Sequence, residues 1–130
     1  PTHGLCKGDT RMRLAPIPRR LRPHQVMLWV CTGVDAWQQP AWRPVPIAHA
    51  YVEPTSSTLL SKQNTQVQLR CTFYVDASDA GCDPAALKRD SEAHGHGMEA
   101  EFAGERYAVE GVSTLYNPDG SVHHWELGGG

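Results

Sequence analysis

Histidine and cysteine side chains are the groups in this chain best suited to binding a metal. His94 and His96 lie in a His-Gly-His-Gly stretch, Cys82 precedes them, and His123 and His124 are adjacent near the end. All five are ligand types for zinc. Adjacent strand residues point to opposite faces, so His123 and His124 are not expected to share one metal ion. The glycines make the first stretch flexible, unlike a preorganised site, and we predict neither a bound metal nor a cofactor.

Acidic and serine side chains give no better case for catalysis. The acids between residues 76 and 90 are irregularly spaced and lack the glycine and glutamate of a calcium loop. The sequence has no phosphate-binding loop, no G-x-S-x-G and no recognisable nucleophile with an orienting base. We therefore predict no catalytic residues and no enzyme activity. The acids concerned are Asp76, Asp79, Asp83 and Asp90.

Composition favours one β-rich domain with many turns. The 130 residues include ten prolines and twelve glycines, and only 20% are charged. No apolar run approaches the ~18 residues of a membrane span, so no membrane partner is expected. We find no charged-then-apolar leader and expect synthesis in the cytoplasm. The four cysteines have no C-x-x-C spacing and are interpreted as free thiols.

Alternation of apolar and polar residues predicts five or six strands, and so an all-β fold, a small antiparallel β-barrel or sandwich. Residues 66–76 alternate most regularly, while the strand at 47–53 is expected to stop at Pro54. Asn117-Pro118-Asp119-Gly120 predicts a turn, and Gly111 indicates a bulge. Asp83 before Pro84 predicts a short helix over 83–90. The expected strands are 25–32, 47–53, 66–76, 98–102, 106–114 and 121–127, and the expected long loops are 33–46, 55–65 and 77–97.

Charge is divided unevenly along the chain. Up to Thr65 there are eight basic and three acidic residues, and from Gln66 onward four basic and eleven acidic. The division is either a solvated surface or a sign of head-to-tail association, in which the basic part of one copy meets the acidic part of the next. The sequence predicts that residues 1–23 form an extended basic arm ahead of a barrel domain at residues 24–130. The arm residues expected to dock on a neighbouring copy or ring are Arg11, Arg13, Arg19, Arg20 and Arg22.

Three blocks of the sequence resemble a known family. They are Phe102 to Val109 (FAGERYAV), Val122 to Leu127 (VHHWEL) and the strand end Tyr51 to Pro54 (YVEP). With the strand order from Arg19 onward, they resemble the minor capsid proteins of the head-tail connector of tailed bacteriophages. That family is similar to the head-closure or stopper proteins of long-tailed siphophages.

The resemblance implies a role in the neck of a virion, for a protein made in the host bacterial cytoplasm. It implies a homo-oligomeric ring of about six or twelve copies, with a portal or adaptor ring on the head side and a tail terminator or tail tube on the other. Such a ring retains packaged DNA within its channel without reading its sequence. The alternatives are another connector ring component, either an adaptor or a tail terminator, and a metal- or ligand-binding β-barrel module.

The resemblance and the strand pattern together assign candidate site residues. A polar loop directed into the channel would act as a plug, and residues 55–65 are the candidate. In the last strand, Trp125 is expected to anchor the core, while His124 and Glu126 share the opposite face and are available to pair across a strand or subunit. The candidate plug residues are Thr55, Ser56, Ser57, Thr58, Leu59, Leu60, Ser61, Lys62, Gln63, Asn64 and Thr65.

Overall fold

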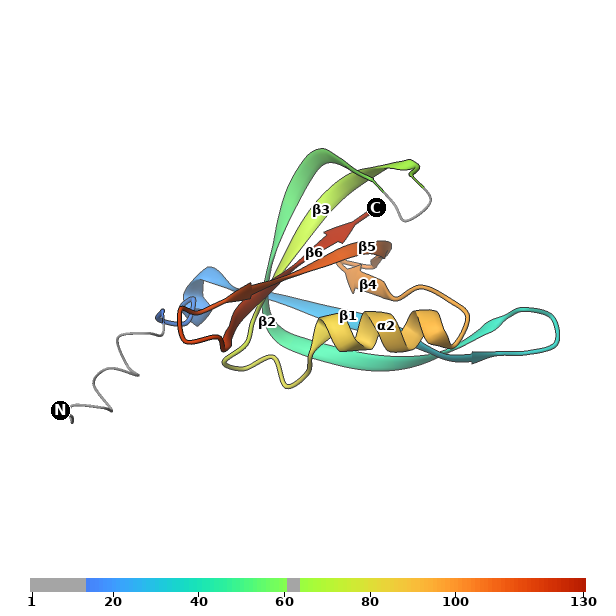
Figure 1. The fold of residues 1–130 in the computed structure, drawn as a ribbon, viewed down its shortest axis with the longest axis horizontal. Helices are drawn as coiled ribbons and strands as arrows, with labels where there is room; N and C mark the ends of the chain where they lie inside the picture. Colours follow the sequence, from blue (N-terminus) through green and yellow to red (C-terminus); the bar gives the residue numbers. More distant parts are fainter. Residues whose placement is uncertain (1–13, 61–63) are drawn as a thin grey trace.

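The computed structural model describes residues 14–60 and 64–130 as a closed antiparallel barrel of six strands with one α-helix. Around the barrel the strands run β1-β2-β3-β6-β5-β4 (Figure 1). The all-β prediction is confirmed, and the barrel is realised rather than the sandwich. The elements are η1 (Arg19–Leu21), β1 (His24–Val34), β2 (Pro40–Leu60), β3 (Gln66–Asp76), α2 (Pro84–Ala93), β4 (Glu99–Phe102), β5 (Glu105–Tyr116) and β6 (Val122–Gly129).

The interior of the barrel is filled by the inward faces of its strands. Leu28, Phe73 and Leu127 have no exposed surface, and Trp125 is 6% exposed. Trp125 therefore anchors the core, as its place in the strand pattern predicts. Inward-facing apolar residues supply most of the favourable free energy of folding of a domain like this one. Apart from α2 no long helix is present among the described residues, and none is long and apolar enough to cross a membrane.

Strand β2 is the main departure from the predicted elements, because it runs unbroken through prolines. Pro44 and Pro46 pair with β1 in register, whereas β3 pairs with β2 only from Ala50 onward. A proline lacks an N–H, so these two nitrogens face the side of β2 on which no strand needs a donor. The predicted loop at 33–46 is therefore wrong from Pro40 onward, and also at Gly33 and Val34, which end β1.

The predicted end of this strand at Pro54 is also wrong. Pro54 lies beyond Ala50, the last β2 residue that pairs with β1, so the edge toward β1 is open there. The strand continues to Leu60 opposite β3, with a register shift between Pro54 and Ser57. A bulge of this kind lets a strand absorb a residue that does not fit the ladder.

Helix α2 begins at the predicted cap and is longer than predicted. The Asp83 carboxylate accepts the N–H of Ala85 at 3.0 Å and of Ala86 at 3.2 Å. The Ser91 hydroxyl, with no exposed surface, accepts the Cys31 N–H at 2.9 Å and donates to the His96 carbonyl at 2.7 Å. These bonds tie the helix to β1 beside a register shift in that strand.

The turns of the C-terminal meander agree with the sequence. Gly120 has a φ of +90° and donates its N–H to the Asn117 carbonyl at 2.9 Å, closing the predicted turn. The expected bulge at Gly111 is confirmed by a register shift between Val109 and Gly111. Strand β6 then extends to Gly129 and lies between β3 and β5.

Gly129 is expected to be intolerant of any side chain. A Cβ there would lie 2.8 Å from Phe73 Cε1 and 3.0 Å from Cys71 Sγ. Because the interior is close-packed, Gly129→Ala should lower the free energy of unfolding by about 1–3 kcal/mol, measured by urea denaturation. The matched control is Gly97→Ala, where a Cβ meets nothing within 4 Å. That variant should stay within about 0.5 kcal/mol of the parent, and equal losses in both variants would contradict the packing argument.

Candidate functional site

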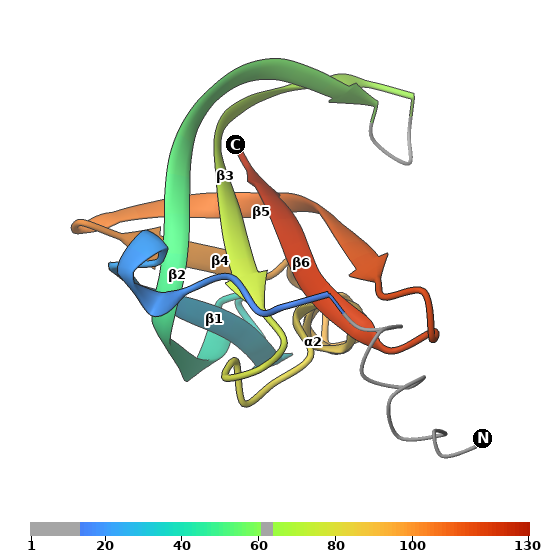
Figure 2. The same cartoon turned by 90° about the vertical axis from the view of Figure 1, so that its left-hand side faces the viewer.

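Residues 14–23, the N-terminal segment, cross the outside of the barrel near the end of β3 and the start of β6 (Figure 2). Three hydrogen bonds hold its first part. The Leu14 N–H donates to Asn117 Oδ1 at 2.8 Å and the Ile17 N–H to Asp76 Oδ2 at 2.8 Å. The Ala15 carbonyl lies 2.8 Å from His123 Nε2. The domain itself therefore holds this part of the predicted arm.

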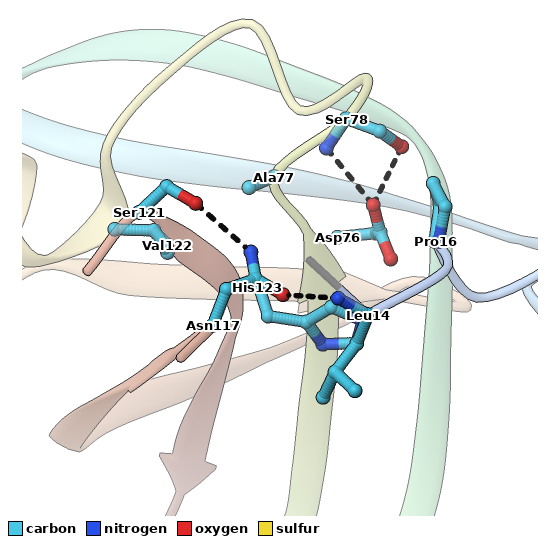
Figure 3. A pocket seen from close by; sticks show the side chains of 9 residues that line it. All are labelled: Leu14, Pro16, Asp76, Ala77, Ser78, Asn117, Ser121, Val122 and His123. Carbon is cyan, nitrogen blue, oxygen red and sulfur yellow. Dashed lines mark hydrogen bonds between the residues drawn. The ribbon is translucent and has the colours of Figure 1, made fainter. Parts of the chain in front are cut away.

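A pocket of about 300 Å³ lies between the N-terminal segment and the barrel. In Figure 3 the side chains of Asp76 and Asn117 lie at its edge, with Leu14 bonded to Asn117. The Asn117 Nδ2 in turn donates to Ser121 Oγ at 3.1 Å. The lining residues are Leu14, Pro16, Asp76, Ala77, Ser78, Asn117, Ser121, Val122 and His123.

The hydroxyls in this pocket are used to shape loops. Ser78 donates to the Asp76 carboxylate at 2.5 Å and Ser121 to the Asp119 carboxylate at 2.6 Å, each across two residues. Side-chain bonds of this kind mimic a backbone turn. Each hydroxyl therefore donates its hydrogen bond to a neighbouring carboxylate. The arrangement as a whole binds the N-terminal segment of the chain.

Asp76 accepts three hydrogen bonds at this site, and it is almost fully buried. Burial alone would raise its pKa. The Ser78 hydroxyl, the backbone N–H groups of Ile17 and Ser78, and the charge of Arg22 together outweigh burial, and the pKa of Asp76 is lowered. Asp76 is therefore ionised at neutral pH and accepts bonds from both the N-terminal segment and its own loop.

Arg22 corrects part of the predicted role of the arm. Its side chain is 2% exposed, and its guanidinium pairs with Asp79 at 2.8 Å while donating to the carbonyls of Ile17 and His49. Arg19 pairs with Asp79 too, at 3.0 Å. Burial acts to raise the pKa of Asp79, but the bonds to Arg22 and Arg19 lower it by more. The pKa of Asp79 therefore falls below its ordinary value. Arg22 cannot contact a neighbouring copy, because a charge so buried needs its partner in place.

The remaining arm arginines have different outcomes. The Arg19 side chain is 64% exposed despite its ion pair, and Arg20 is exposed on η1. Both have side-chain surface that is accessible to another molecule. Arg11 and Arg13 lie outside the described residues.

The candidate plug, residues 55–65, is largely a strand rather than a loop. Thr55, Ser56, Ser57, Thr58, Leu59 and Leu60 belong to β2, and Asn64 and Thr65 lead into β3. The loop prediction failed because the polar run has no apolar alternation, yet backbone pairing with β3 does not require it. Ser61, Lys62 and Gln63 lie outside the described residues. We call Pro54–Leu60 with Gln66–Cys71 the β2–β3 hairpin.

Glycines in β5 and β6 let this hairpin rest on the barrel. A Cβ on Gly128 would lie 2.9 Å from Leu69 Cδ1, and one on Gly111 would lie 3.1 Å from Leu59 Cδ2. The two leucines therefore lie against bare backbone. Thr55 and Thr72 add a hydroxyl pair at 2.8 Å across the strands.

His123 and His124 are brought together, contrary to the prediction from strand alternation. Their Nδ1 atoms lie 2.8 Å apart. Leu115 pairs with His124 and Tyr116 with Val122, so His123 is an extra residue at a bulge and the alternation breaks there. His124 and Glu126 do share a face as predicted, and they pair with each other at 3.0 Å.

The other predicted ligand types are dispersed. His94 lies against Asp90, and the His96 ring packs edge-on to Trp42 at 5.2 Å. In the part of the chain that the structure describes, no three His, Cys, Asp or Glu side chains are grouped to hold a metal ion. Cys31, Cys71 and Cys82 are free thiols, as predicted, and Cys6 lies outside the described residues.

Sequence reasoning missed the residues that bind the N-terminal segment. Asp76, Asp79 and Asn117 were noted only as loop acids or as part of a turn. Asp76 is the last residue of β3, Asn117 directly follows β5, and Asp79 lies three residues beyond β3. Polar side chains near strand ends often cap backbone groups. What the sequence could not show is which distant segment they would bind.

Comparison with known proteins adds no assignment. No protein-family model, no curated protein and no solved structure matches this chain.

Replacing Asp76 should destabilise the protein in a pH-dependent way. Because its folded pKa is lowered, its contribution is full above the ordinary value of 3.8 and is lost as pH falls below it. Asp76→Asn should therefore lower the free energy of unfolding by about 1.5–3 kcal/mol at neutral pH, and by less in acid. Urea midpoints of the parent and the variant, compared at neutral and at acid pH, measure this difference in the free energy of unfolding. Asp90→Asn, at a carboxylate 52% exposed, is the control and should change little. A difference between parent and variant that is unchanged in acid would contradict the stabilising role of the ionised Asp76 carboxylate.

Proposed function

We propose that this protein is a structural subunit of the head-tail connector of a tailed bacteriophage, in the head-closure or stopper position. The observation that carries the proposal is the closed barrel from which a long β2–β3 hairpin extends (Figure 1). The resemblance of the FAGERYAV and VHHWEL blocks to that family supports it independently. On this proposal the protein lies in the virion neck, after synthesis in the host cytoplasm.

The hairpin has the composition expected of an element that lines a DNA channel. Ser56, Ser57 and Thr58 are exposed, and Leu60 is 60% exposed near the tip. From Thr55 to Leu60 no side chain is charged, whereas Lys62 is basic and Arg70, on the β3 side of the hairpin, is paired with Glu105 at 3.0 Å. Such a surface neither repels phosphates nor binds them tightly, as retention of DNA without sequence reading requires.

Ring assembly is supported by charge and by exposed basic side chains. The excess of basic residues before Gln66 and of acidic residues after it suits a head-to-tail contact that closes by rotation. Among the described residues of the arm, Arg19 and Arg20 are the arginines exposed for that contact. The proposed assembly has about six or twelve copies, with a portal or adaptor ring and a tail terminator or tail tube as neighbours. An adaptor or tail terminator subunit remains the alternative of the same class.

Shortening the hairpin tests the proposed plug. Replacing residues 59–67 by Asn-Gly joins Thr58 to Gln68, which already face each other, through a two-residue turn. Particles assembled with this variant should lose DNA from filled heads, measured as nuclease-sensitive DNA, while the barrel stays folded. The control is Trp37→Ser at the tip of the β1–β2 hairpin, where the indole is 82% exposed. Heads that remain sealed with the shortened hairpin would exclude the plug.

Reversing one exposed arm charge tests the proposed ring contact. Arg20→Glu should weaken self-association by about tenfold or more, because it places like charges at a head-to-tail interface. Analytical ultracentrifugation of the purified protein measures the change. Arg89→Glu alters charge equally at an exposed position on α2 and should leave association unchanged. Equal effects of the two substitutions would rule out a specific role for Arg20.

A further inference from the structure

A chain of hydrogen bonds connects the first half of β6 to the N-terminal segment. Glu126 Oε2 lies 3.0 Å from His124 Nε2. The Nδ1 atoms of His124 and His123 are 2.8 Å apart, and His123 Nε2 is 2.8 Å from the Ala15 carbonyl oxygen. Each of these three contacts is at hydrogen-bond distance and needs one hydrogen.

Counting hydrogens shows that this chain carries an extra proton. A carbonyl oxygen only accepts, so His123 Nε2 must carry a hydrogen, and an ionised Glu126 likewise requires one on His124 Nε2. The contact between the two Nδ1 atoms requires a third. Two neutral imidazoles carry only two hydrogens between them. The intact chain therefore holds one proton more than two neutral histidines and an ionised Glu126.

We propose that His123, His124 and Glu126 form a proton-dependent latch that fastens the N-terminal segment to the barrel. With the extra proton bound, all three contacts are attractive. When the proton leaves, one of the three contacts has no hydrogen, and two lone pairs face each other there. The bond from His124 to the Glu126 carboxylate is charge-assisted and is the strongest of the three. The loss therefore falls on one of the two contacts of His123, either the one to His124 or the one to the Ala15 carbonyl, and in either case the link from Glu126 to Ala15 is broken.

The groups facing the latch keep their charge across neutral pH. On β3, Asp76 lies opposite His124 and Tyr74 opposite Glu126. The pKa of Asp76 is lowered, as described above, so it stays ionised. Burial, Glu53 and Glu126 raise the pKa of Tyr74, so it stays neutral. Residues 14–18 have no charged side chain, and the β5 residues opposite the latch are uncharged, namely Leu115 and Ser113.

The direction of the switch follows from the proton count. Histidine ordinarily changes charge between about pH 5 and 8. The latch is closed when the extra proton is bound and opens as rising pH removes that proton. Opening breaks the link from β6 to the Ala15 carbonyl, while Leu14 keeps its bond to Asn117 and Ile17 its bond to Asp76. The Ala15 carbonyl is then available to a donor on another molecule, whether or not that molecule is a connector ring.

Replacing Glu126 by glutamine tests the latch on the isolated full chain. The glutamine amide donates a hydrogen to His124 Nε2, which supplies the missing hydrogen without an added proton. In the parent, the backbone amides of Leu14 and Ala15 should become more mobile on the nanosecond timescale as pH is raised and the extra proton is lost, with the same midpoint as the ring-nitrogen shifts of His123 and His124. Both are measured by nitrogen-15 NMR. In Glu126→Gln these amides should stay ordered throughout.

Two further variants complete the experiment. His123→Ala should leave the two amides mobile at every pH while the amides of the barrel strands are unchanged. Glu110→Gln on β5 removes the same charge outside the hydrogen-bond chain and should behave like the parent. The latch is refuted if Glu126→Gln retains the parent's pH midpoint, or if both histidines are neutral when the segment is ordered. Neither outcome bears on ring assembly or DNA retention, so this test is separate from that of the proposed function.

Discussion

Closure of the barrel depends on one short seam. Strand β4 is only four residues long, and β1 pairs with it at three positions, Met27, Leu28 and Trp29. Outside the seam, the Arg106 guanidinium lies 4.6 Å from the ring of Trp29 and 5.0 Å from that of Trp42. Arg106 also donates to Glu99 at 2.8 Å. The cation–π contacts and the charge-assisted bond of Arg106 thus reinforce a seam that has only three paired positions in its backbone. Without this seam the barrel would have two open edges.

The seam uses three of the four residues of β4, whereas β2 is far longer than its pairing with β1 requires. β2 has 21 residues, but β1 pairs with it only as far as Ala50. The rest of β2 has β3 as its partner and an open edge on the other side. A strand with an open edge is normally protected against pairing with other chains, and Pro54 lies on this one. Beyond Ala50, β2 therefore has β3 as its partner and no pairing with β1. The two strands form the β2–β3 hairpin, the element on which the proposed function depends.

The sequence predicts those parts of the fold in which local pattern and tertiary context agree. The 66–76 strand, the Asp83 cap and the turn at Gly120 were all predictable, because alternation, capping and positive φ are local properties. The course of β2 through its prolines was not, because proline is acceptable only where the facing edge is empty. The meeting of His123 and His124 depends on a bulge whose position is set by the partner strand. The arginines were recognised as an interaction surface, but only the fold shows that Arg22 finds its acid in the same chain.

The N-terminal segment combines one fixed end with one weakly held end. At the fixed end, the buried guanidinium of Arg22 has three acceptors in its own chain. Removing such a group would leave an uncompensated buried charge, so this end stays in place. At the other end, Leu14, Ala15 and Ile17 are each held by a single backbone bond to a barrel side chain. Each such bond contributes about 1 kcal/mol net. Local opening of this end therefore requires far less free energy than unfolding, and a segment anchored at one end can exchange its partners without disturbing the barrel.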